Sequence, residues 1–262
     1  MAPSPQAPGA PTRTDRAATA DAATADAAAA GGREKRAYVR RIFSEIAPRY
    51  DLLNHILSLN IDRAWRRRAL AALGWSARPD GVYLDLCAGT LDVGAQLARL
   101  PGFRGLIVGA DFAEPMLRAG AGKAPRATLV PVAADALELP LAPNVAAGAI
   151  VAFGIRNVAE LDGALREVHR VLAPGARFVI LEFTTPGNPL VRAGYHAYFH
   201  HVLPLIGRVV SGHRTAYAYL PKSVAHFPAP EALADRMRAA GFSAVSWTPL
   251  TLGIAAIHVG TK

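Results

Sequence analysis

From residue 82 onward, apolar segments of strand length alternate with amphipathic segments of helix length, and this alternation restricts the fold more than any other feature. Five segments predict strands: 82–89, 105–113, 128–137, 145–155 and 177–186. Helices are expected over 91–100, 114–124 and 160–175, the last ending at Gly175. Strands separated by helices indicate a parallel sheet with right-handed crossover connections.

The C-terminal part of the chain departs from this alternation. After a helical insertion over 188–226, we expect a helix at 230–242 and then strands at 244–251 and 253–262. The two strands are read as a hairpin turning around Gly253. The sequence therefore predicts an α/β fold with a doubly wound, mostly parallel sheet and an antiparallel edge at its C-terminal end.

The N-terminal part divides into a tail and a set of helices. Residues 1–32 have no aromatic residue and no apolar periodicity, so we expect a disordered low-complexity tail ahead of one domain over 33–262. Residues 33–74 predict helices that precede the first strand. The single cysteine, Cys87, fits a reducing compartment, and no apolar run approaches the ~18–20 residues that span a bilayer. Without the basic-then-apolar order of a signal peptide, the expected location is cytoplasmic.

The net charge of +9 is concentrated in one short stretch. Residues 33–68 contain ten Arg and Lys residues against four acidic ones, whereas residues 1–32 have a net charge of −1. A basic stretch of this kind suits nucleic acid, an anionic membrane surface or an acidic ligand. A solvated helix face is the simpler alternative.

Three acidic residues lie near the carboxyl ends of the first three expected strands, where open α/β sheets bind ligands. Asp85 is within the first strand, Asp111 ends the second and Asp135 follows the third. Asp111 is 22 residues beyond Gly89, the separation expected for a carboxylate that binds ribose hydroxyls. Each aspartate alone could cap a helix or a turn, but the three together indicate a nucleoside site.

The first turn distinguishes between two nucleoside cofactors. A dinucleotide-binding turn has the pattern G-x-G-x-x-G, which lets a pyrophosphate approach the backbone. Residues 87–92 contain one glycine, Gly89, and the carboxylates of Asp85 and Asp92 lie close in sequence. Carboxylates repel a pyrophosphate and attract the cationic amino-acid end of S-adenosylmethionine, which is therefore the predicted cosubstrate.

Several phrases of the sequence resemble the ubiquinone/menaquinone biosynthesis C-methyltransferases: FSEIAPRYDLLNHILSLNIDRAWRR, LDLCAGTLDVG, GADFAEPML, FGIRNV and YAYLPKSVAHFP. The resemblance covers residues 38–262. It implies a class I, Rossmann-like methyltransferase that uses S-adenosylmethionine. The reaction it implies is methylation of a ring carbon of a polyprenylated quinol in menaquinone or ubiquinone biosynthesis, with menaquinone favoured.

The resemblance implies cofactor contacts at Thr90, Asp111, Asp135 and Ala136. Together with the surrounding motifs, the expected cofactor site comprises Asp85, Gly89, Thr90, Asp92, Asp111, Phe112, Met116, Asp135 and Ala136. Three positions depart from the usual pattern: Ala88 and Leu91 where relatives often have glycine, and Ala152 where they often have serine. A leucine at position 91 is tolerated only if the turn closes without a positive φ there.

Transfer of a methyl group to a ring carbon requires contact between ring and sulfonium, and stabilisation of negative charge on a phenolate oxygen. Arg156 suits the second task, with Asn157 orienting a water or a ring oxygen. A guanidinium stays protonated, so Arg156 is not the expected proton acceptor. Water, Tyr50, His55 and His196 remain as acceptors. Alternatively, Arg156 and Asn157 only tie the following helix to the sheet.

The segment 189–210 is apolar and aromatic, which predicts either a lid over a tunnel for the prenyl tail or ordinary core packing. Substrate contacts are expected at Asn54, His55, Tyr195, His196 and Phe199. His196 and His200 are four residues apart but lack an acidic partner, so no metal is expected. A membrane-resident substrate and the basic helices around Trp65 together predict peripheral contact with an anionic membrane.

Two rival functions remain open. A methyltransferase acting on RNA fits the overall charge, but few aromatic residues accompany the basic stretch, so no nucleic-acid partner is expected. A non-catalytic S-adenosylmethionine-binding partner in a biosynthetic complex fits the departures at Ala88, Leu91 and Ala152. Whether the chain forms a homodimer is left open.

Overall fold

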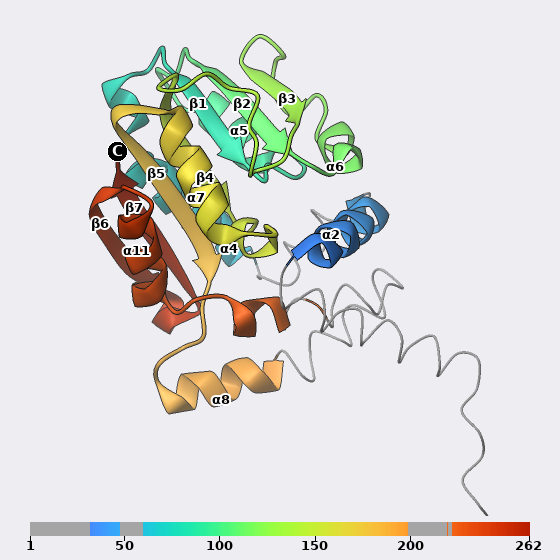
Figure 1. Cartoon of the computed structure of the whole chain (residues 1–262), viewed down its shortest axis with the longest axis vertical. Helices are drawn as coiled ribbons and strands as arrows, with labels where there is room; N and C mark the ends of the chain where they lie inside the picture. The colour runs from blue at the N-terminus through green and yellow to red at the C-terminus, as the bar shows by residue number, and fades with distance from the viewer. Residues whose placement is uncertain (1–31, 48–59, 199–218, 220–221) are drawn as a thin grey trace, which may run out of the picture.

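The computed structural model describes residues 32–47, 60–198, 219 and 222–262. Its seven strands form one sheet in the order β3-β2-β1-β4-β5-β7-β6 (Figure 1). The strands are β1 (Val82–Leu86), β2 (Leu106–Asp111), β3 (Leu129–Ala133), β4 (Ala146–Ala152), β5 (Leu172–Phe183), β6 (Ser243–Leu250) and β7 (Ala255–Thr261). The first five pair in parallel, and β7 is antiparallel to both β5 and β6. The predicted doubly wound sheet with an antiparallel C-terminal edge is confirmed.

Helices cover both faces of the sheet. The described helices are α2 (Gly32–Ile46), α4 (Ile61–Leu73), α5 (Asp92–Ala98), α6 (Glu114–Ala119), α7 (Leu161–Val171), α8 (Pro189–Ala197) and α11 (Pro230–Ala239). Short 3-10 turns are η2 (Trp75–Ala77), η3 (Ile155–Asn157) and η5 (Thr251–Gly253). Apolar residues of α4 and α5 pack with one face, and those of α7 and α11 with the other.

Alternation of side chains along each strand produces these two cores. In β1, Tyr83 belongs to the cluster beneath α4 and α5, whereas Leu84 and Leu86 belong to the cluster beneath α7 and α11. Both faces are buried, as expected for parallel strands with crossover helices. The sheet is therefore a rigid base whose strand ends are fixed in position.

Two predicted helix ends are wrong. The helix expected over 114–124 ends at Ala119. The helix expected over 160–175 ends at Val171, and residues from Leu172 onward already belong to β5. Pro174 explains the difference, because proline disfavours the helical conformation of the residue before it. Gly175 has φ +77 within the strand and does not cap the helix. At the end of α4, by contrast, Gly74 caps the helix in the left-handed conformation.

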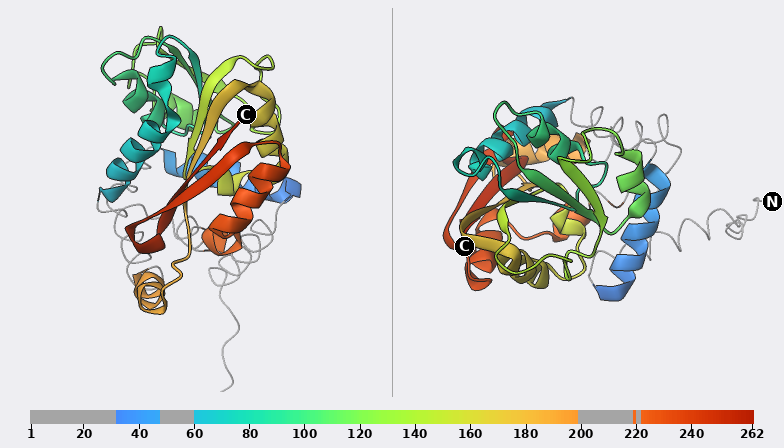
Figure 2. Two further views of the ribbon diagram at one scale, coloured as in Figure 1. Left: turned by 90° about the vertical axis from the view of Figure 1, so that its left-hand side faces the viewer. Right: turned by 90° about the horizontal axis from the view of Figure 1, so that it is seen from above.

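Helix α2 lies apart from the two layers. It packs against α6 and η3, and Figures 1 and 2 both place it beside α6. Because α6 and η3 follow the carboxyl ends of β2 and β4, α2 crosses the edge of the sheet where ligands bind in this fold class.

Candidate active site

The turn after β1 has an unusual backbone. Cys87, Gly89 and Leu91 all have positive φ values, 51°, 52° and 65°. The condition that the sequence analysis set for Leu91 is therefore not met, although the turn closes. Its side chain is 2% exposed and packs over Gly109, where an added Cβ would lie 2.4 Å from Leu91 Cδ2. Burial of this leucine offsets a backbone cost of about 1–3 kcal/mol.

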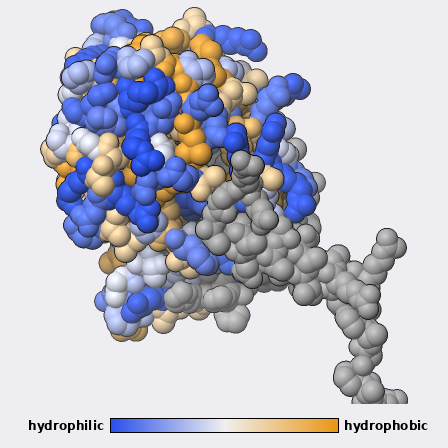
Figure 3. Space-filling view, viewed as in Figure 1, coloured by the Kyte–Doolittle hydropathy of each residue, from blue (hydrophilic) through white to orange (hydrophobic). Residues whose placement is uncertain are grey.

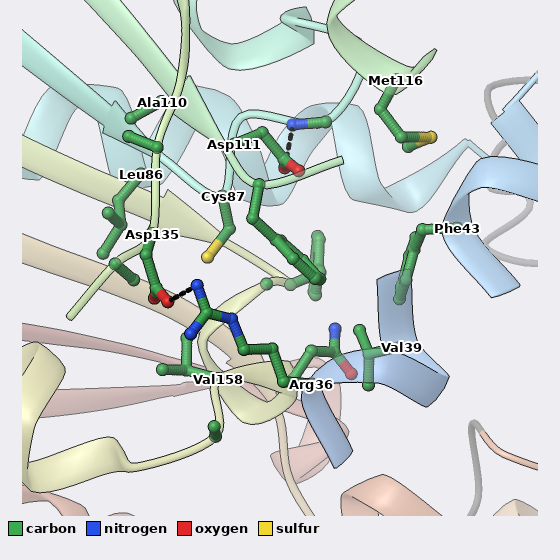
Figure 4. Close-up of a pocket in the computed structure, with 18 of the residues that line it drawn as sticks. Arg36, Val39, Phe43, Leu86, Cys87, Ala110, Asp111, Met116, Asp135 and Val158 are labelled. Carbon is green, nitrogen blue, oxygen red and sulfur yellow. Dashed lines mark hydrogen bonds and ion pairs between the residues drawn. The ribbon is translucent and has the colours of Figure 1, made fainter. Parts of the chain in front are cut away.

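Asp111, the last residue of β2, fixes this turn. One carboxylate oxygen accepts a hydrogen bond from the Gly89 N–H at 2.8 Å (Figure 4). The other accepts from the Ala113 N–H at 2.8 Å. Burial raises the pKa of Asp111 against the opposing effect of these two bonds. The structure thus brings together Gly89 and Asp111, the pair singled out by their spacing.

A cleft opens between this turn and helix α2. The cofactor residues expected from the sequence that line it are Gly89, Asp111, Phe112, Met116, Asp135 and Ala136. Arg36, Val39 and Phe43 of α2 close its other side (Figure 4). Arg36 Nη2 lies 2.5 Å from Asp135 Oδ2, so an ion pair crosses the cleft.

Three of the expected cofactor residues do not line this cleft. Asp85 is buried beneath the turn and accepts a hydrogen bond from the Gly94 N–H at 2.8 Å; burial raises its pKa to about 7. Asp92 accepts from Arg66 at 2.9 Å and from Lys123 at 2.6 Å. Thr90 is also buried. The hydrogen bonds of Asp85 and Asp92 therefore go to α5, Arg66 and Lys123.

Asn157 and Arg156 point to different places. Asn157 lines the cleft, and its Oδ1 is buried with no hydrogen-bond partner among the described residues. Arg156 Nη1 donates to Glu182 Oε1 at 2.5 Å and to the Phe153 carbonyl, while Nε donates to Ser223 Oγ at 3.4 Å. Its Nη2 donates to no described residue. The two neighbours therefore serve two separate cavities.

The second cavity has a volume of about 200 Å³. Its lining includes Lys35, Arg156, Tyr219, Ser223, His226 and Arg236. Val158 and Ala159 line both this cavity and the cleft, so the two spaces adjoin across one short segment. Such a pair of adjoining sites can hold a nucleoside on one side and a second molecule on the other.

Comparison with known proteins agrees with this geometry. A model of the ubiE/COQ5 methyltransferase family matches residues 31–262. The chain belongs to this family. The demethylmenaquinone methyltransferase of Thermus thermophilus is 49% identical over 84% of this chain and 100% of that protein. The demethylmenaquinone methyltransferase of Deinococcus radiodurans is 46% identical over 87% of this chain and 94% of its own length.

A further relative has a broader name. The ubiquinone/menaquinone biosynthesis C-methyltransferase UbiE of Geobacter sulfurreducens is 42% identical over 87% of this chain and 90% of that protein. Solved structures agree on the fold. A SAM-dependent methyltransferase of Thermotoga maritima has a TM-score of 0.58 at 17% identity, over 86% of this chain and 99% of that one. Membership of the family makes this chain an S-adenosylmethionine-dependent methyltransferase.

The cleft residues fit S-adenosylmethionine. The buried Oδ1 of Asn157 needs a hydrogen-bond donor, which the amino group of this cosubstrate carries. Asp111 and Asp135 add two carboxylates, and Phe112 and Met116 add apolar walls. A pyrophosphate has no donor for Asn157 and is repelled by both carboxylates. The observed lining therefore suits a cationic nucleoside.

Several expected site residues cannot be placed. Tyr50, Asn54, His55 and Phe199 lie outside the described residues, as does the side chain of His196. His200, the other member of the histidine pair, also lies outside them. Tyr195 is buried in α8 and lines neither cavity; burial raises the pKa of its hydroxyl.

The sequence did not predict Lys35, Arg36 and Tyr219, which line the two cavities, or Glu182, which pairs with Arg156. Glu182 had a signal, because a carboxylate in the apolar strand FVILEF needs a buried cation as a partner. No sequence signal distinguished Lys35 and Arg36, because they are two of ten cations in a basic stretch. Their position became evident only from the path of α2 across the strand ends.

Proposed function

We propose that this protein methylates a ring carbon of a polyprenylated quinol, converting demethylmenaquinol to menaquinol. The observation that carries the proposal is the FGIRNV segment, which separates the cofactor cleft at Asn157 from the second cavity at Arg156. The names of the relatives from Thermus and Deinococcus support menaquinone over ubiquinone.

In this proposal the quinol ring occupies the second cavity. A cavity of about 150 Å³ holds benzene, so about 200 Å³ admits an aromatic ring. Arg156 Nη2, which donates to no described residue, faces the ring oxygen, while the bonds of Nε and Nη1 hold the guanidinium plane in place. S-adenosylmethionine supplies an electrophilic methyl group on a positively charged sulfur.

The residues of the chain have separate tasks. Asp111 and Asp135 hold the nucleoside, Asn157 accepts a hydrogen bond from the amino-acid end, and Arg156 orients the ring oxygen. The proton of the ring hydroxyl passes to water, Tyr50, His55 or His196. The bond between the ring carbon and the methyl group forms as the sulfur–methyl bond breaks, and the hydrogen of the methylated carbon then leaves as a proton while the ring oxygen regains one. Asn54 and Phe199 are assigned to the quinol and its tail, and Tyr195, which lines neither cavity, to the tail alone.

A methyl-transfer assay tests the function. Purified protein with radiolabelled S-adenosylmethionine is offered synthetic demethylmenaquinol, a lipid extract and total RNA in parallel. We expect label in the quinol and in the lipid extract. Label in RNA alone overturns the proposal in favour of an RNA methyltransferase, and cofactor binding without any transfer favours a non-catalytic role. Complementation of strains that lack either quinone-pathway methyltransferase then separates menaquinone from ubiquinone.

A cytoplasmic enzyme with this substrate must visit the membrane surface, and we assign that contact to exposed arginines of α2 and α4. None of the helices in the described part of the chain has the length and hydrophobicity of a membrane span. Arg40 and Arg41 of α2 and Arg63, Arg67 and Arg68 of α4 are exposed. The surface over α2 is largely hydrophilic (Figure 3). These features support an electrostatic contact with anionic lipid.

Trp65 does not take part in this contact, contrary to the sequence analysis. Its ring is 5% exposed, and its indole N–H donates to Thr251 Oγ1 at 2.9 Å. Vesicle flotation tests the remaining electrostatic contact: binding to vesicles containing phosphatidylglycerol is expected to exceed binding to neutral vesicles and to decline with added salt. Equal binding to both counts against it.

A further inference from the structure

The charges around the second cavity do not cancel. Arg156 is paired with Glu182, and Arg236 Nη1 lies 3.1 Å from Asp162 Oδ1. Lys35 Nζ donates to the backbone carbonyl of Arg156 at 2.8 Å, and no carboxylate of the described residues pairs with it. The ammonium of Lys35 is therefore a positive charge without a balancing negative charge, held at the wall of the cavity.

Tyr219 adds an unused donor to the same cavity. Its side chain is 4% exposed, and its Oη has no hydrogen-bond partner in the described part of the chain. The ring packs edge-on against Tyr38, with centroids 5.7 Å apart. Burial raises the pKa of Tyr219 to about 12, so at neutral pH the hydroxyl keeps its proton and donates. Such a buried hydroxyl costs about 1–3 kcal/mol until an acceptor arrives.

We propose that the ammonium of Lys35 and the hydroxyl of Tyr219 together bind the phenolate oxygen of the methyl acceptor in the second cavity. This inference rests on the proposed function and assigns the compensating charge to Lys35. The Arg156 guanidinium is already balanced by Glu182 and orients the ring. Lys35 and Tyr219 keep their own protons, and the quinol proton goes to one of the acceptors named above.

Two substitutions of Lys35 separate this role from simple support of the Arg156 carbonyl. Lys35→Gln keeps an N–H donor and loses the charge, whereas Lys35→Arg keeps both. We expect Lys35→Gln to lower kcat on the order of a hundredfold, with cofactor affinity unchanged, and Lys35→Arg to retain most activity. Glu45→Gln, which removes an exposed charge from the same helix, is the matched control and is expected to retain full activity.

The pH profile gives a second readout. Burial, and then the charge of Arg156, lower the pKa of Lys35. The other titratable groups that line the cavity with Lys35 are Arg156, Arg236, His226 and Tyr219; Glu182 pairs with Arg156, Asp162 pairs with Arg236, and the ring of Tyr38 packs on Tyr219. If the charged lysine is needed, kcat/KM falls as pH rises through this lowered pKa. In Lys35→Arg that alkaline decline is expected to disappear, because a guanidinium stays protonated.

Tyr219→Phe supplies an independent variant, because it removes one oxygen and leaves the aromatic packing. We expect kcat to fall about tenfold while the thermal midpoint of unfolding stays within a few degrees. Wild-type kcat in folded Lys35→Gln, or an unchanged alkaline limb in Lys35→Arg, overturns the inference. Failure of the proposed function looks different: the wild-type protein then binds S-adenosylmethionine but does not label the quinol.

Discussion

Asp111 is the residue whose hydrogen bonds join β2 to the first turn, and its carboxylate is the expected ligand of the ribose. Asp111→Asn keeps the size of the side chain and removes its charge. We expect the dissociation constant for S-adenosylmethionine to rise about ten- to hundredfold, since hydrogen bonds to a charged group contribute about 1.5–3 kcal/mol. Isothermal titration calorimetry measures this change.

The control for this measurement is Asp80→Asn. Asp80 pairs with Arg104 on the surface, and both side chains are more than 60% exposed. The cofactor affinity of this variant is expected to match the wild type. An unchanged dissociation constant in Asp111→Asn rules out the ribose assignment.

Arg156 lines the second cavity and not the cofactor cleft, so its substitution should separate binding from catalysis. We expect Arg156→Lys to keep cofactor affinity within about threefold and to lower methyl transfer by about a hundredfold, because lysine has no second amino nitrogen for the ring oxygen. Lysine is chosen over alanine because Glu182 is buried, and leaving it unpaired costs about 3–5 kcal/mol. Loss of cofactor binding in a folded Arg156→Lys variant contradicts the assignment.

At the scale of elements, α2 acts as a cover over the cofactor cleft through the ion pair between Arg36 and Asp135. This pair must open if Asp135 is to accept a hydrogen bond from a nucleoside. Arg36 is 56% exposed, and an exposed ion pair contributes about 0.2–1 kcal/mol. We therefore expect Arg36→Ala to tighten cofactor binding, by up to about fivefold.

Arg118→Ala is the matched control for this prediction. It breaks an equally short but exposed pair with Glu114 within α6. The dissociation constant of the control is expected to equal that of the wild type when both are measured by calorimetry. Weaker binding in Arg36→Ala shows that Arg36 itself contacts the cofactor.

The helices and strands from β1 to β4 were largely predictable, because hydrophobic periodicity and residue composition indicate the same type of element in each segment. The boundary between α7 and β5 was misplaced because Gly175 resembles a helix stop, whereas Pro174 had already excluded the helix. The conformation of Leu91 could not be predicted, because the space that accepts it comes from Gly109 on another strand. Local sequence carries no information about that contact.

The site was predictable to a different degree in its two halves. Asp111, Asp135 and Asn157 follow strand ends, so the topology places them together. The sequence could not predict that Asn157 lines the cleft while Arg156 lines the second cavity. Both belong to one 3-10 turn, and the direction of the Arg156 side chain depends on its ion pair with Glu182, which is distant in sequence. Asp85, Thr90 and Asp92 belong to the same motif but do not line the cleft, and sequence spacing does not distinguish them from the residues that do.

For the whole molecule, the protonation of Asp85 connects stability to pH. Burial raises its pKa to about 7 from the ordinary 3.8, so between these values the folded protein holds a proton that the unfolded chain has lost. This contribution to the free energy of unfolding is complete below about pH 4, declines as pH rises and is gone above about pH 7. Asp111, whose pKa is also raised, acts in the same direction.

Asp85→Asn tests this dependence. Urea unfolding at pH 5 and pH 8 is expected to show a smaller loss of stability with rising pH in the variant than in the wild type, because asparagine does not titrate. Asp162→Asn, a change at an exposed carboxylate, is expected to keep the wild-type dependence. If the free energy of unfolding changes equally between pH 5 and pH 8 in Asp85→Asn and in the wild type, Asp85 is not the source of the pH dependence.

The position of β7 between β5 and β6 has a consequence for biosynthesis. Of all the strands, Ala255–Thr261 leaves the ribosome last, yet it joins β6 to the rest of the sheet. Until it arrives, β6 has no neighbour and the hydrogen-bonding groups along one edge of β5 face solvent. Exposed strand edges recruit other chains, so the nascent polypeptide is most prone to aggregate after β6 has emerged and before β7 pairs with β5 and β6.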